Sequence, residues 1–173
     1  MKNEQRYAQQ PTIDIPRFVI NDSQNIKGTM NAGLLIPFFV EQEVYPGETW
    51  SVDTAAIVRM MTPKVPIMDN AFLDIYYFFT PHRIVWDHFK EFFGENNTSA
   101  WTQPTEYTIP QLTLVNGKNA QAGNTLDAMG IPLNVNTSIS QIPLRVYTKT
   151  WNTWFRDQNV TAPVTEYSND RLS

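Results

Sequence analysis

The chain has 173 residues, of which 42% are hydrophobic and 17% charged, and its formal net charge is −4. This hydrophobic content excludes a disordered chain, and the absence of any run of Lys or Arg argues against a polybasic nucleic-acid-binding arm. There is no cysteine, which excludes disulfides and cysteine-ligated metals. Charged residues are scarcer than in ordinary soluble domains, and Asn, Gln and Thr replace them. Such a surface is suited to being covered by neighbouring subunits. Composition alone, however, favours a polar but neutral monomer.

Residues 1–32 carry little periodicity and many polar side chains, and Pro11 and Pro16 disfavour helix there. We expect an extended arm that docks on a neighbouring surface. The first six residues lack the apolar stretch of a signal peptide, and the longest apolar runs, such as residues 34–40, are too short to cross a bilayer. The sequence therefore predicts no membrane insertion.

Three strands are expected between residues 33 and 80. Residues 33–40 form an apolar run in which Pro37 indicates an edge strand or a bulge. Pro46-Gly47 suits the two central positions of a type II turn. Residues 50–60 alternate as a half-buried strand, with apolar positions on one face. Residues 71–79 are apolar on both faces, which predicts a central strand that ends before Pro81.

A helix is predicted directly after the central strand. Thr80 is a suitable N-cap, Pro81 suits the first helical position and Gly94 suits the position just past the helix. Its apolar face is formed by Val85, Phe89, Phe92 and Phe93.

Residues 94–142 are interrupted by proline and glycine and predict a long irregular excursion, with a possible short strand within residues 107–115. A second amphipathic helix is predicted from residue 142 onward, and it ends at the polar residues 156–159. The stripe of this helix is formed by Tyr147, Trp151, Trp154 and Phe155. The remaining tail is polar and open. Three strands do not close a sandwich, so more chain or a partner is expected to complete the fold.

The chemical motifs are weak. His82 and His88 lie six residues apart on a predicted helix and project in different directions, so they favour surface hydrogen bonding over a shared metal. We identify no phosphate-binding loop and no serine or cysteine nucleophile motif. We therefore expect no enzyme, no cofactor and no catalytic or metal-binding residue.

One alternative is a carbohydrate-binding or carbohydrate-cleaving β-sandwich, because glycosidases use paired carboxylates and aromatic side chains line sugar clefts. The residues that motivate it are Trp86, Asp87, Glu91, Glu95 and Trp101. A solvated acidic stripe on a helix explains the same pattern more simply.

Several motifs follow one another across residues 17–159. The main ones are Lys27-Gly28-Thr29-Met30-Asn31-Ala32-Gly33, Glu43-Val44-Tyr45-Pro46-Gly47-Glu48-Thr49, Tyr77-Phe78-Phe79-Thr80-Pro81-His82-Arg83-Ile84-Val85-Trp86 and Trp154-Phe155-Arg156-Asp157-Gln158-Asn159. In this order they resemble the N-terminal part of the major capsid protein of the Microviridae, small single-stranded DNA phages, and most closely the gokushovirus group. Glu48 and Thr80 depart mildly from the usual Asp and Val of that family.

The resemblance implies a mainly β fold: a viral jelly-roll β-sandwich, incomplete in this chain, with long loop insertions and short helices. Residues 1–32 would be the arm, and residues 33–173 the N-terminal part of one jelly-roll domain with an insertion at about 94–142. The candidate interface or core residues are Phe78, Phe79, Pro81, Arg83, Trp86, Tyr147, Trp151, Trp154, Phe155, Arg156 and Asp157.

The resemblance further implies a structural protein of the virion. It would form pentamers within a T=1 icosahedral shell around circular single-stranded DNA and would assemble in the bacterial host cytoplasm. The implied partners are a phage DNA-binding protein, a pilot protein, a scaffolding protein and a host surface receptor.

Overall fold

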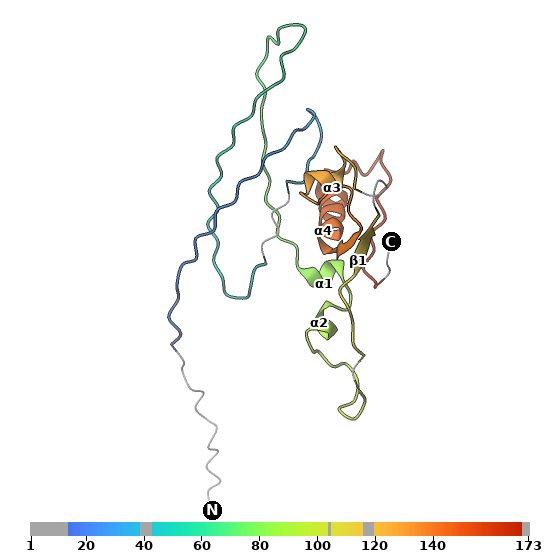
Figure 1. Cartoon of the computed structure of the whole chain (residues 1–173). Helices are drawn as coiled ribbons and strands as arrows, with labels where there is room; N and C mark the ends of the chain where they lie inside the picture. The colour runs from blue at the N-terminus through green and yellow to red at the C-terminus, as the bar shows by residue number, and fades with distance from the viewer. Residues whose placement is uncertain (1–13, 39–42, 104, 116–119, 171–173) are drawn as a thin grey trace, which may run out of the picture.

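The computed structural model describes residues 14–38, 43–103, 105–115 and 120–170 (Figure 1). Figure 1 shows the helices and the sheet gathered in one compact part, while the residues that precede the first helix run as long extended segments beside it. The elements, in chain order, are α1 (His82–Val85), α2 (Phe89–Phe92), β1 (Gln111–Leu114), α3 (Thr125–Ala128), β2 (Thr137–Ser140), α4 (Ile142–Thr150) and the π-helix η1 (Trp151–Phe155).

β1 and β2 form an antiparallel pair in which Gln111 lies opposite Ser140 and Leu114 opposite Thr137. The pair faces an apolar cluster centred on Leu114, Ala120 and Leu126. The short strand expected within residues 107–115 is therefore confirmed. The surrounding region was expected to be irregular, but it also contains β2, α3 and a hydrophobic cluster of its own.

The prediction of a single helix after Pro81 is wrong, because the structure has two separate helices there, α1 and α2. Trp86 has extended backbone angles (φ −145°, ψ 116°), and the next amide, of Asp87, donates to the carbonyl of Ser168 at 2.8 Å. In a continuous helix the Asp87 amide would instead donate to a carbonyl one turn earlier in the same helix. Pro81, not Thr80, occupies the N-cap position of α1. Gly94 has φ +95° just past α2, as predicted for a glycine there.

The second predicted helix is confirmed as α4, followed directly by η1. Pro143 lies in its first turn, where a missing N–H costs nothing. η1 ends at Phe155, and the amide of the next residue, Arg156, donates to the carbonyl of Trp151 at 2.9 Å. A second apolar cluster joins α4 to α1 through Val85, Trp86 and Ile142.

The three strands predicted before Pro81 do not form in the described residues. Residues 33–38, 50–60 and 71–79 carry no ladder hydrogen bonds, and residues 39–40 lie outside the described residues. The segment 71–79 is also not buried: Phe72 is 85% exposed, and Phe79 is 73% exposed. A strand requires a neighbouring strand to complete its hydrogen bonds, and the sheet of the described residues contains only β1 and β2.

The turn between the first two of these segments is confirmed. Gly47 has φ +86°, and the amide of Glu48 donates to the carbonyl of Tyr45 at 3.3 Å, as in a type II turn. Residues 14–32 of the expected arm are exposed throughout, and residues 1–13 lie outside the described part. Among the described residues, no helix is both long and apolar enough to cross a membrane.

Candidate assembly interface

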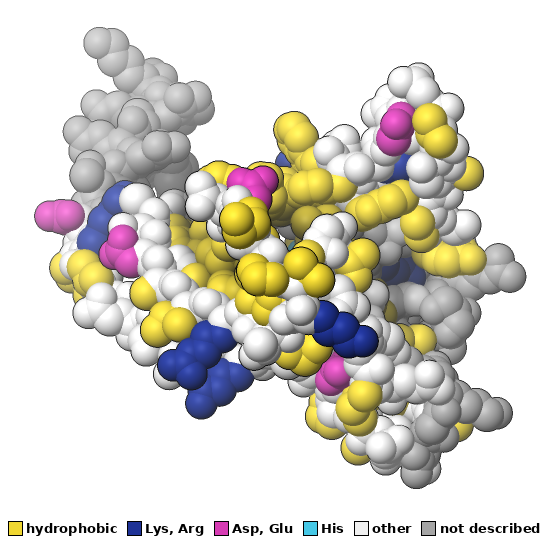
Figure 2. Space-filling model, turned by 90° about the horizontal axis from the view of Figure 1, so that it is seen from above, with side chains coloured by type: hydrophobic (Ala, Val, Ile, Leu, Met, Phe, Trp, Pro, Cys, Tyr) yellow, Lys and Arg dark blue, Asp and Glu magenta, His cyan; other side chains and the backbone are white. Residues whose placement is uncertain are grey.

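Large apolar side chains remain uncovered over most of the extended segments. Figure 2 shows apolar side chains spread across one face of the molecule, with few charged groups between them. Monomeric soluble proteins rarely leave contiguous apolar patches of this extent in water, and such patches mark contact surfaces. Representative exposed side chains are Phe18, Val19, Ile57, Met61, Met68, Phe72 and Phe79.

An aromatic cluster attaches the extended segment 71–79 to η1. We call it the aromatic seam; it consists of Tyr76, Phe78, Trp154 and Phe155. The Phe155 ring lies edge-on to Tyr76 and to Phe78, with centroids 5.4 Å and 5.8 Å apart, and Phe78 lies 6.4 Å from Trp154. These geometries are the favourable ones for aromatic pairs. Trp154 is nevertheless 71% exposed, so the seam keeps an apolar outer face.

Arg145 joins α1 to α4 from inside the compact part. It is buried, and its guanidinium donates to the Val85 carbonyl (Nη1, 3.2 Å) and to Gln141 Oε1 (Nη2, 2.8 Å). Burial lowers the pKa of Arg145, while the negative charges of Asp170 and Asp87 oppose that shift. Arg145 thus satisfies the carbonyl that the short α1 leaves open at its end.

The C-terminal residues 161–170 form a strap across α4, η1 and α1. Asn152 donates to the Val164 carbonyl (2.8 Å) and to Glu166 Oε1 (2.7 Å), and its own oxygen accepts from the Val164 amide (3.0 Å). Lys149 pairs with Glu166 Oε2 at 2.8 Å. The sequence predicted an open polar tail, and these residues are largely exposed, but hydrogen bonds hold them to the compact part. No local pattern indicates these contacts, because each joins residues far apart in the chain.

The far end of the strap fixes the region between α1 and α2. Asp170 accepts from the indole N–H of Trp86 (Oδ1, 2.7 Å), and its second oxygen lies 2.9 Å from His88 Nδ1. Partial burial alone would raise the pKa of Asp170, but the bonds from Trp86 and His88 outweigh it and the pKa is lowered. Ser168 donates to Asp87 Oδ2 at 2.8 Å.

The predicted interface or core residues divide into buried and exposed groups. Trp86 is fully buried and belongs to the core. Pro81, Tyr147, Trp151, Phe155 and Arg156 are partly buried, and Tyr147 donates to the Leu35 carbonyl at 3.1 Å. The candidates that remain exposed, and therefore open to contact, are Phe78, Phe79, Arg83, Trp154 and Asp157.

The two histidines do not share a site. The His82 ring lies edge-on to Phe89 at 5.2 Å, whereas His88 stacks on Tyr107 at 4.1 Å. In the described ranges, no group of three or more His, Asp or Glu side chains gathers where it could hold a metal ion.

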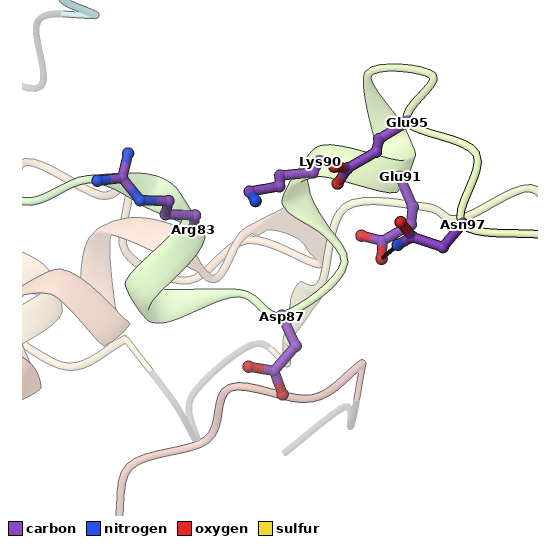
Figure 3. Close-up of a pocket in the computed structure, with 6 residues that line it drawn as sticks. All are labelled: Arg83, Asp87, Lys90, Glu91, Glu95 and Asn97. Atoms are coloured by element: carbon purple, nitrogen blue, oxygen red, sulfur yellow. Dashed lines mark hydrogen bonds between the residues drawn. The ribbon is translucent and has the colours of Figure 1, made fainter.

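The acidic residues that motivated a sugar cleft line an open hollow of about 400 Å³ together with Arg83, Lys90 and Asn97. Figure 3 shows Asp87 pointing toward the strap, away from Glu91 and Glu95. Asn97 donates to Glu91 Oε1 at 2.9 Å. Trp86 is fully buried, so its ring cannot contact a sugar. Asp87 diverges from the two glutamates, and neither Trp86 nor Trp101 is among the residues that line the hollow, so this hollow does not support the carbohydrate alternative.

In the described residues, an apolar surface lies exposed and extended segments lack strand partners, which indicates that further protein covers them. The chain belongs to the capsid protein (F protein) family, whose model matches residues 8–171. The resemblance stated from the sequence motifs is thereby confirmed.

Three capsid proteins, each named VP1, are similar to this chain. That of Bdellovibrio phage phiMH2K is 36% identical over 159 residues, 91% of this chain and 29% of the relative. That of Chlamydia phage 1 is 35% identical and covers 98% of this chain and 29% of the relative. That of Spiroplasma virus 4 is 35% identical over 86% of this chain and 26% of the relative. The chain thus spans less than a third of the length of these relatives.

Proposed function

We propose that the chain is the N-terminal part of a structural major capsid protein that assembles with copies of itself into a phage shell. The observation that carries the proposal is segment 71–79, which is apolar on both faces yet uncovered in the described structure. Such a segment is stable only when strands and side chains cover both of its faces. Membership of the capsid protein family supports the wall of a capsid shell as the place where the segment is covered.

In the proposed shell, segments 33–40, 50–60 and 71–79 become strands of a jelly-roll β-sandwich. Their hydrogen-bonding partners come from protein outside the 173 residues, since the relatives are more than three times as long as their matched parts. The strap and Arg145 hold α1 against α4, and the aromatic seam packs segment 71–79 against η1. The compact part then acts as a fixed base from which the strands extend.

The same proposal extends to the whole particle. Pentamers of the protein build a T=1 icosahedral shell that encloses circular single-stranded DNA and forms in the host cytoplasm. Assembly involves a DNA-binding protein, a pilot protein and a scaffolding protein, and the finished shell contacts a receptor on the host. The low charge of the chain and its amide-rich surface support a role in extensive subunit contacts.

A nuclease-protection experiment tests the proposal. The whole protein that contains this chain, produced together with the proposed DNA-binding, pilot and scaffolding proteins, is sedimented, treated with nuclease and extracted for DNA. We expect fast-sedimenting particles that protect circular single-stranded DNA, while added double-stranded DNA of equal length is degraded. Protein that remains a slow-sedimenting monomer, with no protected DNA under all assembly conditions, would contradict the proposal.

A further inference from the structure

The π-helix η1 is a widened turn at the end of α4. It follows α4 without a break, and the amide of Arg156 donates to the carbonyl of Trp151, five residues earlier, at 2.9 Å. Such turns are rare, and they occur frequently at functional sites. The Thr153 hydroxyl donates to the Lys149 carbonyl at 2.8 Å, a contact that slightly destabilises and bends an α-helix. Contacts from outside the helix are needed to stabilise the widened turn.

The strap supplies these contacts through one buried side chain. Asn152 is 7% exposed, and its oxygen accepts from the Val164 amide at 3.0 Å. Its nitrogen donates to the Val164 carbonyl at 2.8 Å and to Glu166 Oε1 at 2.7 Å. A buried amide that pointed elsewhere would lose these partners, which is costly. The bonds therefore fix the rotation of η1 about its own axis.

Polar contacts hold the strap more than apolar burial does. Val164 is 51% exposed and Tyr167 is 38% exposed. An open hollow of about 220 Å³ lies between the strap and the helix, lined by Tyr147, Thr148, Trp151 and Val164. Segments with few buried apolar contacts and exposed hydrogen bonds open locally at a low cost in free energy. The strap can therefore detach while the two apolar clusters stay folded.

The same turn holds segment 71–79 through the aromatic seam. Phe155, three residues after Asn152, lies edge-on to Tyr76 and Phe78, with centroids 5.4 Å and 5.8 Å apart. An α-helix turns by about 100° per residue, so loss of the extra residue in the turn would rotate Phe155 by an angle of that order. Edge-on ring contacts would not survive such a rotation. Figure 1 shows the strap and segment 71–79 on opposite sides of α4, so the strap acts on the segment through η1.

We propose that the strap, bound through Asn152, holds η1 in its π-helical form and thereby positions segment 71–79 through Phe155. When the strap detaches, residues 151–155 adopt the α-helical register, Phe155 leaves the seam, and the segment loses this attachment to the compact part. Asn152 is thus a positioning residue, and η1 is the element with two arrangements that couples the two sites. The coupling belongs to a single subunit; its use in preparing the segment for strand pairing rests on the proposed function.

A fluorine label at position 155 tests the coupling in the whole protein before assembly. Para-fluorophenylalanine replaces Phe155 by nonsense suppression, and the rings of Tyr76 and Phe78 displace its resonance in the nuclear magnetic resonance spectrum. Asn152→Ala should move this resonance toward its position in urea-unfolded protein. Asn159→Ala is the matched control, because that side chain is exposed near the same turn, and the resonance should not move.

A change confined to the strap separates its effect from any effect of Asn152 on the helix itself. Val164→Pro combined with Glu166→Ala removes the amide that donates to Asn152 and the carboxylate that binds Asn152 and Lys149. The sequence of α4 and η1 stays intact. Protease cleavage within residues 161–170 should become faster, and the fluorine resonance should move in the same direction as with Asn152→Ala.

Thermodynamic linkage requires the coupling to act in both directions. Tyr76→Ala combined with Phe78→Ala breaks the seam from the other side. Protease cleavage of the strap should then accelerate at least about fivefold, the low end of typical coupling between sites. Met68→Ala removes a 95% exposed side chain from the same extended region, and the cleavage rate should not change.

The outcomes separate this inference from the proposed function. An unmoved resonance in Asn152→Ala or in the strap variant, a strap variant that is cleaved no faster, or a seam variant with unchanged cleavage would overturn the coupling and leave the capsid role intact. With the coupling present, Asn152→Ala should raise the protein concentration needed for shells about fivefold or more. Shells at the wild-type concentration would refute the role of the coupling in assembly. Wild-type protein that forms no shells would contradict the capsid role itself, and the coupling measured before assembly would stand.

Discussion

Trp86 is the side chain whose loss should most weaken the compact part. It is fully buried, it packs beside Val85 and Ile142, and its indole N–H donates to Asp170 Oδ1 at 2.7 Å. Replacement of a buried Trp by Ala typically costs about 3–5 kcal/mol. We expect Trp86→Ala to lie near the upper end of that range, because it removes both the core ring and the bond that fixes the strap.

Trp86→Phe separates the two contributions. It keeps an aromatic ring in the core but deletes the donor to Asp170, whose side chain is 41% exposed and can be rehydrated. We therefore expect a cost of about 1.5 kcal/mol, the low end for a hydrogen bond to a charged group, together with a smaller loss from packing.

Urea unfolding of unassembled protein, followed by far-ultraviolet circular dichroism, measures both variants. Trp101→Ala is the matched control, since its side chain is 97% exposed and its removal should change the free energy of unfolding by less than about 0.5 kcal/mol. If Trp86→Ala matched that control, Trp86 would not be a core residue, and the account of how the strap is fixed would be refuted.

Three further perturbations test the strap and the extended segments. Asn152→Ala removes the bonds to Val164 and Glu166, so hydrogen exchange at the Val164 amide should accelerate at least tenfold while the exchange of β1 stays unchanged. Acid should also release the strap: the pKa of Glu166 is lowered by Lys149 and Asn152 against partial burial, and that of Asp170 is lowered as well. A carboxyl group whose pKa is lowered in the folded state stabilises the strap above the usual carboxyl pKa of about 4. This stabilisation is lost as the pH falls through the folded-state pKa. Protease cleavage in residues 161–170 should therefore rise at low pH but should not change between pH 6 and 8. Tyr147→Phe deletes the bond from α4 to the extended segment and should cost about 0.5–1.5 kcal/mol in urea unfolding; an unchanged midpoint would show that this bond adds nothing.

The elements that the sequence predicts well are those with local signals. The aromatic spacing from Tyr147 to Phe155 repeats with the helical period, and α4 and η1 follow it. Gly47 and Gly94 both adopt positive φ where the turn and the helix end require it. The sequence predicts a possible short strand within residues 107–115, where β1 lies, but not its partner β2, since pairing depends on contacts distant in sequence.

The predictions that failed depend on partners that no local pattern specifies. Segment 71–79 has the composition of a central strand, yet it remains extended and exposed because the described residues provide no neighbouring strand. The predicted helix after Pro81 is interrupted because Ser168 binds the Asp87 amide from the far end of the chain. No local pattern in the sequence reveals that Arg145 is buried against the Val85 carbonyl.

We propose that segment 71–79 becomes a covered strand in a capsid wall, and electron cryo-microscopy of purified particles would show this strand directly. We expect icosahedral shells in whose walls residues 71–79 pair with strands on both sides, with Phe72 and Phe79 buried. Particles in which this segment stays unpaired and exposed to solvent, or a discrete monomer in place of shells, would contradict it.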